Sequence, residues 1–168
     1  HGNVVDVFDF VMQQDPRRIA IVMERLEGTT LATRIARKGA LSREHALALT
    51  DEVLDVLVAV HALGVVHRDL KPHNLIFRTP EAEKAEAPKL KVLDFGIAKF
   101  TQTKVAHQTM VGSALGTPAY MAPEQSGGME VGPKADVYAV GELLFEMVTG
   151  RRLFQGSSGE VRLQKRER

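Results

Sequence analysis

The sequence predicts an α+β fold in which helices dominate and a few short antiparallel strands accompany them. Three observations support this class. Runs of β-branched and aromatic residues flank a turn-like Gln-Asp-Pro near the N-terminus, and two long apolar segments have helical length and cap residues. Two short apolar runs between those segments read as further strands. At 168 residues, the chain is long enough for one domain with a sizeable core.

The first element predicted is a β-hairpin. Residues 4–11 and 19–23 are rich in Val, Ile and Phe, and they flank the turn residues 14–16. Gly28 and two threonines then interrupt the pattern. A short helix is predicted to follow over Leu31–Lys38.

Two longer helices are predicted further along the chain. Ser42 is a suitable N-cap for a helix that runs to about His61 and is ended by Gly64. The second half of this helix is apolar on nearly every face, which is typical of a helix buried inside a domain. A second strongly apolar helix is predicted over residues 135–149, closed by Gly150.

The remaining segments are predicted to be short strands, loops and a tail. Residues 75–77 and 90–93 read as strands, and residues 79–88 between them as a solvated excursion. No sustained period runs through residues 97–120, so a loop is expected there. From residue 151 onward the chain is basic and contains Gly-Ser-Ser-Gly, which predicts a poorly ordered tail.

Composition excludes several classes of protein. The net charge is +1, with a pI near 8.2, so no strong field favours nucleic acid or an anionic membrane. The chain has no cysteine, which excludes disulfides and thiolate zinc sites. No apolar run reaches the roughly 18 residues of a membrane span, and the first ten residues lead us to expect no signal peptide. We expect a cytoplasmic segment, whose parent protein could be anchored in a membrane elsewhere.

Three motifs carry the chemistry. The segment His-Arg-Asp-Leu-Lys-Pro-His-Asn at 67–74 is followed by Asp-Phe-Gly at 94–96 and Ala-Pro-Glu at 122–124. Alone, each motif is more often a surface ion pair or an ordinary turn, but together and in this order they match one signature set. Asp69 could accept a hydroxyl proton, and Lys71 lies near enough in sequence to meet a phosphate.

Two oxygen donors suit magnesium. Asn74 follows Asp69 by five residues, and Asp94 lies on a turn after a predicted strand. Mg²⁺ is a hard cation that takes amide and carboxylate oxygens together with phosphate oxygens. The motifs therefore predict phosphoryl transfer assisted by magnesium.

The chain resembles a eukaryotic-type Ser/Thr protein kinase, and most closely the bacterial branch of that family, from His1 to about Phe154. The resemblance implies ATP and Mg²⁺ as cofactors and a protein substrate with a Ser or Thr acceptor. It implies that Asp69 is the catalytic base, Lys71 the phosphate-directed lysine, and Asn74 and Asp94 the metal ligands. Thr117, in Gly-Thr-Pro before Ala-Pro-Glu, would bond to Asp69 and Lys71.

The resemblance also assigns a nucleotide site. Met23 would be the gatekeeper residue, and the backbone of Glu24 and Leu26 would meet the adenine edge. Ile76 would form part of the apolar floor under the ring. Taken singly, Met23 and Ile76 also fit plain core packing.

Two further contacts are implied in the core. Asp136 would hold the backbone of the turn at His67 and Arg68. His67 and Phe95 would stack against each other rather than ligate a metal ion.

Regulation by phosphorylation is implied as well. Arg68 directly precedes Asp69, and in the family such an arginine pairs with a phosphate on the activation segment, here residues 94–124. This implies an upstream kinase or a dimer partner that modifies the segment. Of its candidate acceptors, Thr109 and Ser113 are preferred by position over Thr101 and Thr103.

Some family features are absent from this sequence. It contains no G-x-G-x-x-G and no lysine before Lys38. We therefore expect a fragment: residues 1–27 a remnant of the strand-rich lobe and hinge, 28–154 the C-terminal lobe, and 155–168 the tail. Two functions stay open, a Ser/Thr kinase fragment that is weakly active alone, and a truncated kinase-like binding module without catalysis.

Overall fold

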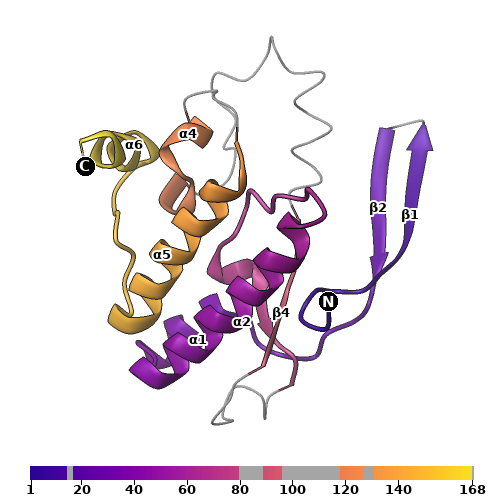
Figure 1. Ribbon diagram of the computed structural model, residues 1–168, viewed down its shortest axis with the longest axis horizontal. Coiled ribbons are helices and arrows are strands. Elements are labelled where there is room, and N and C mark those ends of the chain that lie inside the picture. The colour runs from indigo at the N-terminus through magenta and orange to yellow at the C-terminus, as the bar shows by residue number, and fades with distance from the viewer. Residues whose placement is uncertain (15–16, 80–88, 96–117, 127–130, 168) are drawn as a thin grey trace.

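The computed structural model describes residues 1–14, 17–79, 89–95, 118–126 and 131–167. In these residues the helices gather into one body, and a β-hairpin extends away from it (Figure 1). This arrangement of helices with short antiparallel strands confirms the predicted α+β class.

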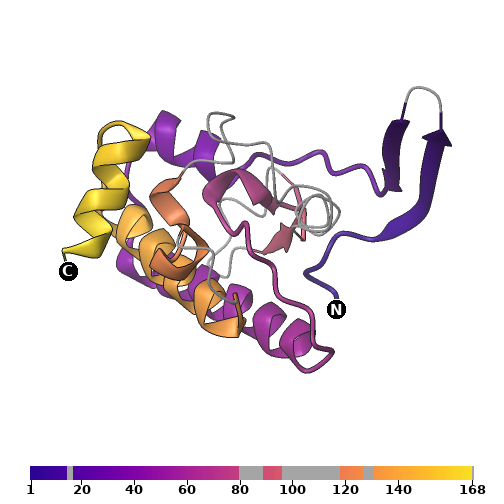
Figure 2. The same cartoon turned by 90° about the horizontal axis from the view of Figure 1, so that it is seen from above.

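The hairpin consists of β1 (Val7–Gln14) and β2 (Arg17–Met23), paired antiparallel with Val11 opposite Ala20. The prediction of two strands is confirmed, although β1 begins three residues later than predicted. Large apolar side chains on the hairpin face solvent, and Phe8 is 69% exposed. The hairpin projects from the helical body (Figure 2), so its two strands have little beyond each other to pack against.

The segment before β1 belongs to a second sheet. There, β3 (Leu75–Phe77) pairs antiparallel with β4 (Leu90–Val92). Val4 forms a parallel bridge to Val92, the Val5 amide donates to the Val92 carbonyl at 3.1 Å, and the Val92 amide donates to the Asn3 carbonyl at 2.7 Å. Val4 and Val5 therefore extend this sheet instead of the hairpin. The excursion predicted over residues 79–88 falls almost entirely outside the described residues.

The first two helices match their predictions. Helix α1 (Leu31–Lys38) starts where the Thr30 hydroxyl accepts from the Thr33 amide at 3.1 Å. Helix α2 (Arg43–His61) starts where the Ser42 hydroxyl accepts from the His45 amide at 3.2 Å. Each cap satisfies an amide that the first helical turn leaves without a partner. Gly64 follows α2 with a positive φ of 73°, as a helix-ending glycine does.

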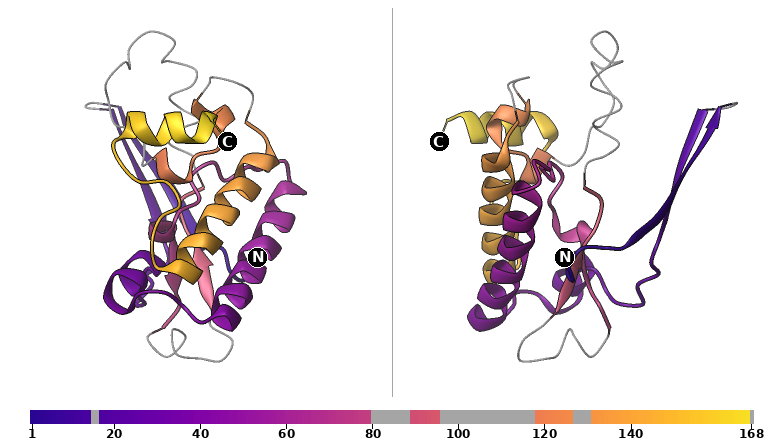
Figure 3. Two further views of the ribbon diagram at one scale, coloured as in Figure 1. Left: turned by 90° about the vertical axis from the view of Figure 1, so that its left-hand side faces the viewer. Right: turned by 45° about the vertical axis from the view of Figure 1, so that its right-hand side comes forward.

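The core lies between α2 and α5 (Pro133–Thr149), which run side by side (Figure 3). Helix α5 starts two residues earlier than predicted and ends, as predicted, at Gly150 with φ of 70°. The buried side chains that α2 and α5 contribute here include Leu49, Val53, Val140, Leu143 and Met147. Within the described part of the chain, no helix combines the length and apolarity that crossing a membrane requires.

The C-terminal tail differs from its prediction. Residues 158–166 form helix α6 (Ser158–Arg166), so a poorly ordered tail is wrong for this segment. Ser157 and Glu160 form a capping box that starts the helix. Val161 and Lys165 are buried on its inner face, against the short elements η2 (Pro118–Tyr120) and α4 (Pro123–Ser126). The helix forms despite the Gly- and Ser-rich composition because the burial of Val161 and Lys165 against η2 and α4 stabilises it.

Gly28 is expected to be intolerant of any side chain. A Cβ atom at this position would lie 1.5 Å from the Phe77 carbonyl oxygen, and both are backbone-fixed. Gly28→Ala should therefore lower the free energy of unfolding by at least about 1–3 kcal/mol, measured in urea. Gly141→Ala is the matched control, because a Cβ in that exposed helical site meets nothing within 4 Å. Gly141→Ala should raise the free energy of unfolding by up to about 1 kcal/mol, because alanine favours a helix more than glycine does. Equal changes in unfolding free energy for the two variants would contradict the prediction.

Candidate active site

Asp136, in the first turn of α5, fixes the loop that carries the first motif. Its carboxylate is 1% exposed and accepts from the amides of His67 and Arg68, both at 2.8 Å. His61, at the end of α2, adds a third contact at 2.8 Å from its Nε2 atom. Arg68 has a positive φ of 65°, which is strained for a residue with a side chain. The predicted contact of Asp136 with this turn is confirmed, and it offsets that strain.

His67 joins this turn to the strand that leads to Asp94. Its ring is fully buried, and Nε2 lies 2.9 Å from the Leu93 carbonyl. The Asp69 amide donates to Nδ1 at 3.2 Å, so the ring is neutral with its proton on Nε2. The ring also contacts Phe95, with centroids 4.7 Å apart and planes tilted by 45°. The predicted contact between His67 and Phe95 is confirmed.

The buried ring predicts a pH effect on stability. Burial lowers the pKa of His67 below its usual 6.5, and outweighs the Leu93 carbonyl, Asp136 and Asp69, which all raise it. As the pH falls through about 6.5, the His67 imidazole therefore binds a proton in the unfolded chain but stays neutral in the folded chain. Stability is full above this pH and should fall as pH drops below it, by up to about 1.4 kcal/mol per pH unit.

This slope can be measured by urea unfolding between pH 7.5 and about pH 5. His67→Phe should lower the slope of unfolding free energy against pH by the contribution of one proton, about 1.4 kcal/mol per pH unit at most. This holds whatever the substitution does to the unfolding free energy itself. His73→Phe is the control, because it replaces an exposed histidine by the same residue. An unaltered slope in His67→Phe would contradict the assignment.

Asp69, Lys71 and Asn74 converge at the end of the turn. The Lys71 ammonium lies 2.7 Å from Oδ2 of Asp69, and both side chains are partly exposed. The Asn74 amide nitrogen donates to the Asp69 backbone carbonyl at 2.9 Å and approaches Oδ2 at 3.4 Å. A carboxylate, an ammonium and an amide therefore meet at one point, reachable from solvent. Such a group can accept a proton and stabilise phosphate charge.

Asp94 is brought to the same end of the sheet by the pairing of β3 with β4. The Leu93 amide donates to the Asn74 carbonyl at 2.8 Å, directly before Asp94. Asp94 is exposed and has a positive φ of 52°. Among the described residues other than glycine, only Arg68 and Asp94 have a positive φ. Arg68 directly precedes Asp69, and Asp94 directly follows Leu93, whose amide binds the Asn74 carbonyl. Strain of this kind concentrates at functional sites.

The oxygen donors near Asp69 suit Mg²⁺, which needs few ligands from the protein, better than a metal ion that is coordinated by protein side chains alone. No cluster of three or more His, Cys, Asp or Glu able to hold a metal occurs in the described part of the chain. Mg²⁺ commonly binds one or two protein oxygens and completes its shell with water and phosphate. The amide oxygen of Asn74 and the carboxylate of Asp94 fit that requirement.

The predicted nucleotide-site residues lie along β2, the segment after it, and β3. Met23 ends β2, Leu26 lies three residues on, and both are partly buried. Ile76 is partly buried on β3 and bridges to Thr30. The Glu24 amide donates to the Asp6 carbonyl at 2.9 Å.

Lys91 joins this region to β4 and was not foreseen from the sequence. Its ammonium, on a side chain only 5% exposed, pairs with Glu24 and lies 3.4 Å from Asp6. The hydrogen bond from Lys91 is the main cause that lowers the pKa of Glu24. A lysine in a short strand carries no sequence signal for such a role, because its partners lie 67 and 85 residues away.

Comparison with known proteins agrees with this geometry. A family model described as "Protein kinase domain" matches residues 1–168. This chain belongs to the protein kinase family. Serine/threonine-protein kinase Pkn1 of Myxococcus xanthus is 42% identical over 92% of the chain, and PkaB of Streptomyces coelicolor 39% over 93%. PrkC of Bacillus subtilis is 36% identical over 94% of the chain. The aligned region spans 21%, 37% and 23% of these relatives' own lengths, respectively.

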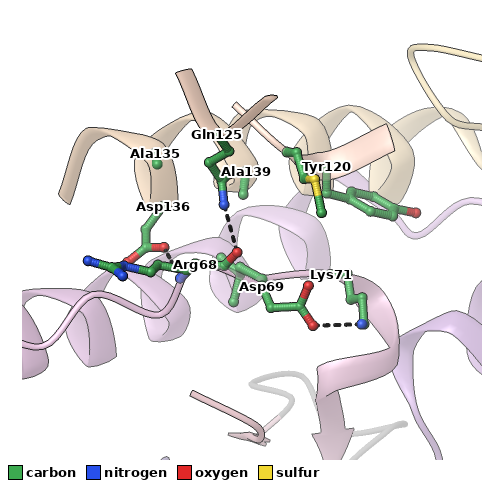
Figure 4. Close-up of a pocket in the computed structure, with 10 residues that line it drawn as sticks. Arg68, Asp69, Lys71, Tyr120, Gln125, Ala135, Asp136 and Ala139 are labelled. Carbon is green, nitrogen blue, oxygen red and sulfur yellow. Dashed lines mark hydrogen bonds and ion pairs between the residues drawn. The ribbon is translucent and has the colours of Figure 1, made fainter. Parts of the chain in front are cut away.

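A small pocket of this kinase chain opens beside Asp69 and Lys71 (Figure 4). Tyr120, Met121 and Gln125 also line it. The Gln125 amide donates to the Arg68 carbonyl at 2.8 Å and accepts from the Ala122 amide at 2.8 Å. Gln125 therefore ties the Ala-Pro-Glu segment to the residue before Asp69. Gln125 was not predicted as a site residue from the sequence, although it directly follows that motif.

Several predicted residues lie outside the described part of the chain. They include Thr117, the glycine of Asp-Phe-Gly, and the candidate phosphorylation sites Thr101, Thr103, Thr109 and Ser113. Nothing in the geometry bears on their assigned roles.

Proposed function

We propose that this chain carries the catalytic site of a Ser/Thr protein kinase, which transfers the γ-phosphoryl group of ATP to protein hydroxyls with Mg²⁺. The observation that carries the proposal is the cluster of Asp69, Lys71 and Asn74 beside the strand end that bears Asp94. A lone His-Arg-Asp would not require this convergence, whereas in-line phosphoryl transfer does.

Each residue has one role in the proposed reaction. The acceptor hydroxyl attacks the γ-phosphorus, its proton passes to the Asp69 carboxylate, and the bond from the γ-phosphorus to the bridging oxygen breaks to release ADP. Lys71, already held against Asp69 at 2.7 Å, would stabilise charge on the transferred group. Asn74 and Asp94 would hold Mg²⁺, which neutralises phosphate charge when bound. Thr117 would orient Asp69 and Lys71.

The nucleotide would lie along the segment that joins the hairpin to α1. The backbone of Glu24 and Leu26 would meet the adenine edge, with Met23 and Ile76 as apolar neighbours. The ion pair between Glu24 and Lys91 supports this assignment, because it fixes the segment relative to β4, which leads to Asp94.

A second part of the proposal concerns regulation. Arg68 is held by its backbone to Asp136, one residue before the proposed base. A phosphate on Thr109 or Ser113 would pair with its guanidinium and order the activation segment. A separate kinase, or a second copy of this chain, would have to supply that phosphate.

The proposal is tested by phosphoryl transfer from γ-labelled ATP to peptide libraries with Ser, Thr or Tyr acceptors, across a Mg²⁺ titration. We expect label on Ser and Thr. Asp94→Asn should lower the rate at least about 100-fold and weaken the response to Mg²⁺. Asp55→Asn, an exposed change on α2, is the control and should be neutral. Absence of label with the unmodified chain, or equal rates for both variants, would contradict the proposal and favour a binding module.

A further inference from the structure

Lys165 on α6 occupies a buried cage that the proposed chemistry does not use. Its side chain is 4% exposed, and the ammonium donates to the backbone carbonyls of Ala119 at 2.7 Å and Met121 at 2.8 Å. Glu142 of α5, also 4% exposed, forms an ion pair with it at 3.3 Å. The ammonium therefore donates two hydrogen bonds to backbone carbonyls, and the Glu142 oxygen contributes charge and not a hydrogen bond.

Two aromatic rings complete the cage. The ammonium lies 4.9 Å from the ring centroid of Tyr138 and 5.1 Å from that of Phe154. Both distances are within the range of cation–π attraction. A buried charge is costly unless it is paired and hydrogen-bonded, and one ion pair and two hydrogen bonds offset that cost for Lys165. The cage is therefore a built contact and not an incidental surface pair.

The segment that Lys165 holds is the wall of the pocket beside the proposed base. Tyr120 and Met121 both line that pocket, and Figure 4 shows Tyr120 across from Asp69 and Lys71. Tyr120 stands in the chain between Ala119 and Met121, whose carbonyls Lys165 binds. The Tyr120 hydroxyl donates to Glu146 of α5, so the Tyr120 side chain is also fixed to this helix. Lys165 contacts the backbone of this wall through the Ala119 and Met121 carbonyls.

We propose that Lys165 is a positioning residue for the protein acceptor: it latches residues 119–121 to α5 and α6, and so holds in place the wall beside Asp69 against which the acceptor segment would lie. The proposal rests on the proposed kinase function for the identity of the substrate. The nucleotide would lie elsewhere, along the segment where Glu24 pairs with Lys91. Loss of the latch should therefore affect acceptor binding and spare ATP binding.

The test compares Lys165→Met with the full chain in two measurements. The first is amide hydrogen exchange of residues 119–122, which we expect to become at least about tenfold faster without the latch. The second is steady-state kinetics with an acceptor peptide and ATP varied separately. The KM for the peptide should rise about tenfold or more, while the KM for ATP stays within about twofold. Arg166→Met is the matched control, because Arg166 is exposed on the same helix.

If Lys165→Met fails to fold, Glu142→Gln is a second variant that tests the same latch. It removes the paired charge but leaves both carbonyl bonds, and should raise the peptide KM by a smaller factor than Lys165→Met. Unchanged exchange in a folded Lys165→Met, or parallel rises in both KM values, would overturn the latch. If the unmodified chain transfers no phosphate, the proposed function fails, whereas the exchange measurement still decides whether Lys165 holds the wall.

Discussion

Replacing Asp69 by asparagine should lower the rate of phosphoryl transfer by about 10²–10⁴-fold. The change keeps the size of the side chain but removes the carboxylate that would take the hydroxyl proton. It also removes the negative charge 2.7 Å from the Lys71 ammonium, so the lysine loses its orienting partner. The measurement is single-turnover transfer from labelled ATP to a Ser peptide, which isolates chemistry from product release.

The reason to expect a loss in rate and not in affinity is the position of Asp69. It lies at the pocket and contacts Lys71 and Asn74, whereas the proposed adenine contacts come from Glu24 and Leu26. The dissociation constant for ATP should therefore stay within about threefold. Asp51→Asn, exposed on α2, is the control and should change neither quantity. A loss below about tenfold in Asp69→Asn would rule out its role as general base.

Replacing Asp136 by alanine should destabilise the chain by about 3–5 kcal/mol. The carboxylate is almost fully buried and accepts from two backbone amides and from the His61 ring, all at 2.8 Å. Alanine would leave those donors without an acceptor, and the desolvation of each unpaired donor is costly. Thermal or urea unfolding, followed by circular dichroism, measures the loss.

Val137→Ala provides the matched control for Asp136→Ala. Val137 is the next residue on the same helix and is 56% exposed, so its truncation should change stability by less than about 0.5 kcal/mol. Asp136→Asn should fall between the two, because it retains one acceptor oxygen. The same ΔΔG for Asp136→Ala and Val137→Ala would show that the three hydrogen bonds contribute nothing to stability.

Elements with local signals could be predicted closely from the sequence. Ser42, Gly64 and Gly150 mark helix ends through contacts within a few residues, and the structure bears out all three. The first motif also indicated a carboxylate at Asp69 and an ammonium two residues on at Lys71, and in the structure these two groups lie 2.7 Å apart. In each case the physical cause lies within one turn of the chain.

Contacts between distant segments could not be predicted in this way. Lys165 reads as one of many basic residues in the tail, and only the fold brings it 46 residues back to Ala119. Lys91 and Gln125 are similar, since their partners lie in other elements. Helix α6 was missed because Gly-Ser-Ser-Gly suggests flexibility, although its second glycine stands within the helix and the Ser-x-x-Glu capping box was present in the sequence.

The anchoring of the turn at His67 and Arg68 has a mechanical consequence. A loop held by two backbone bonds to a core helix cannot pivot separately from that helix. The hairpin is joined to the body through Val4 and Val5 before it and the stretch after Met23, and its side chains at Phe8, Phe10 and Val22 are exposed. In the proposed reaction, a movement of the hairpin relative to this turn would admit ATP and release ADP, and it would pivot near the salt bridge between Glu24 and Lys91.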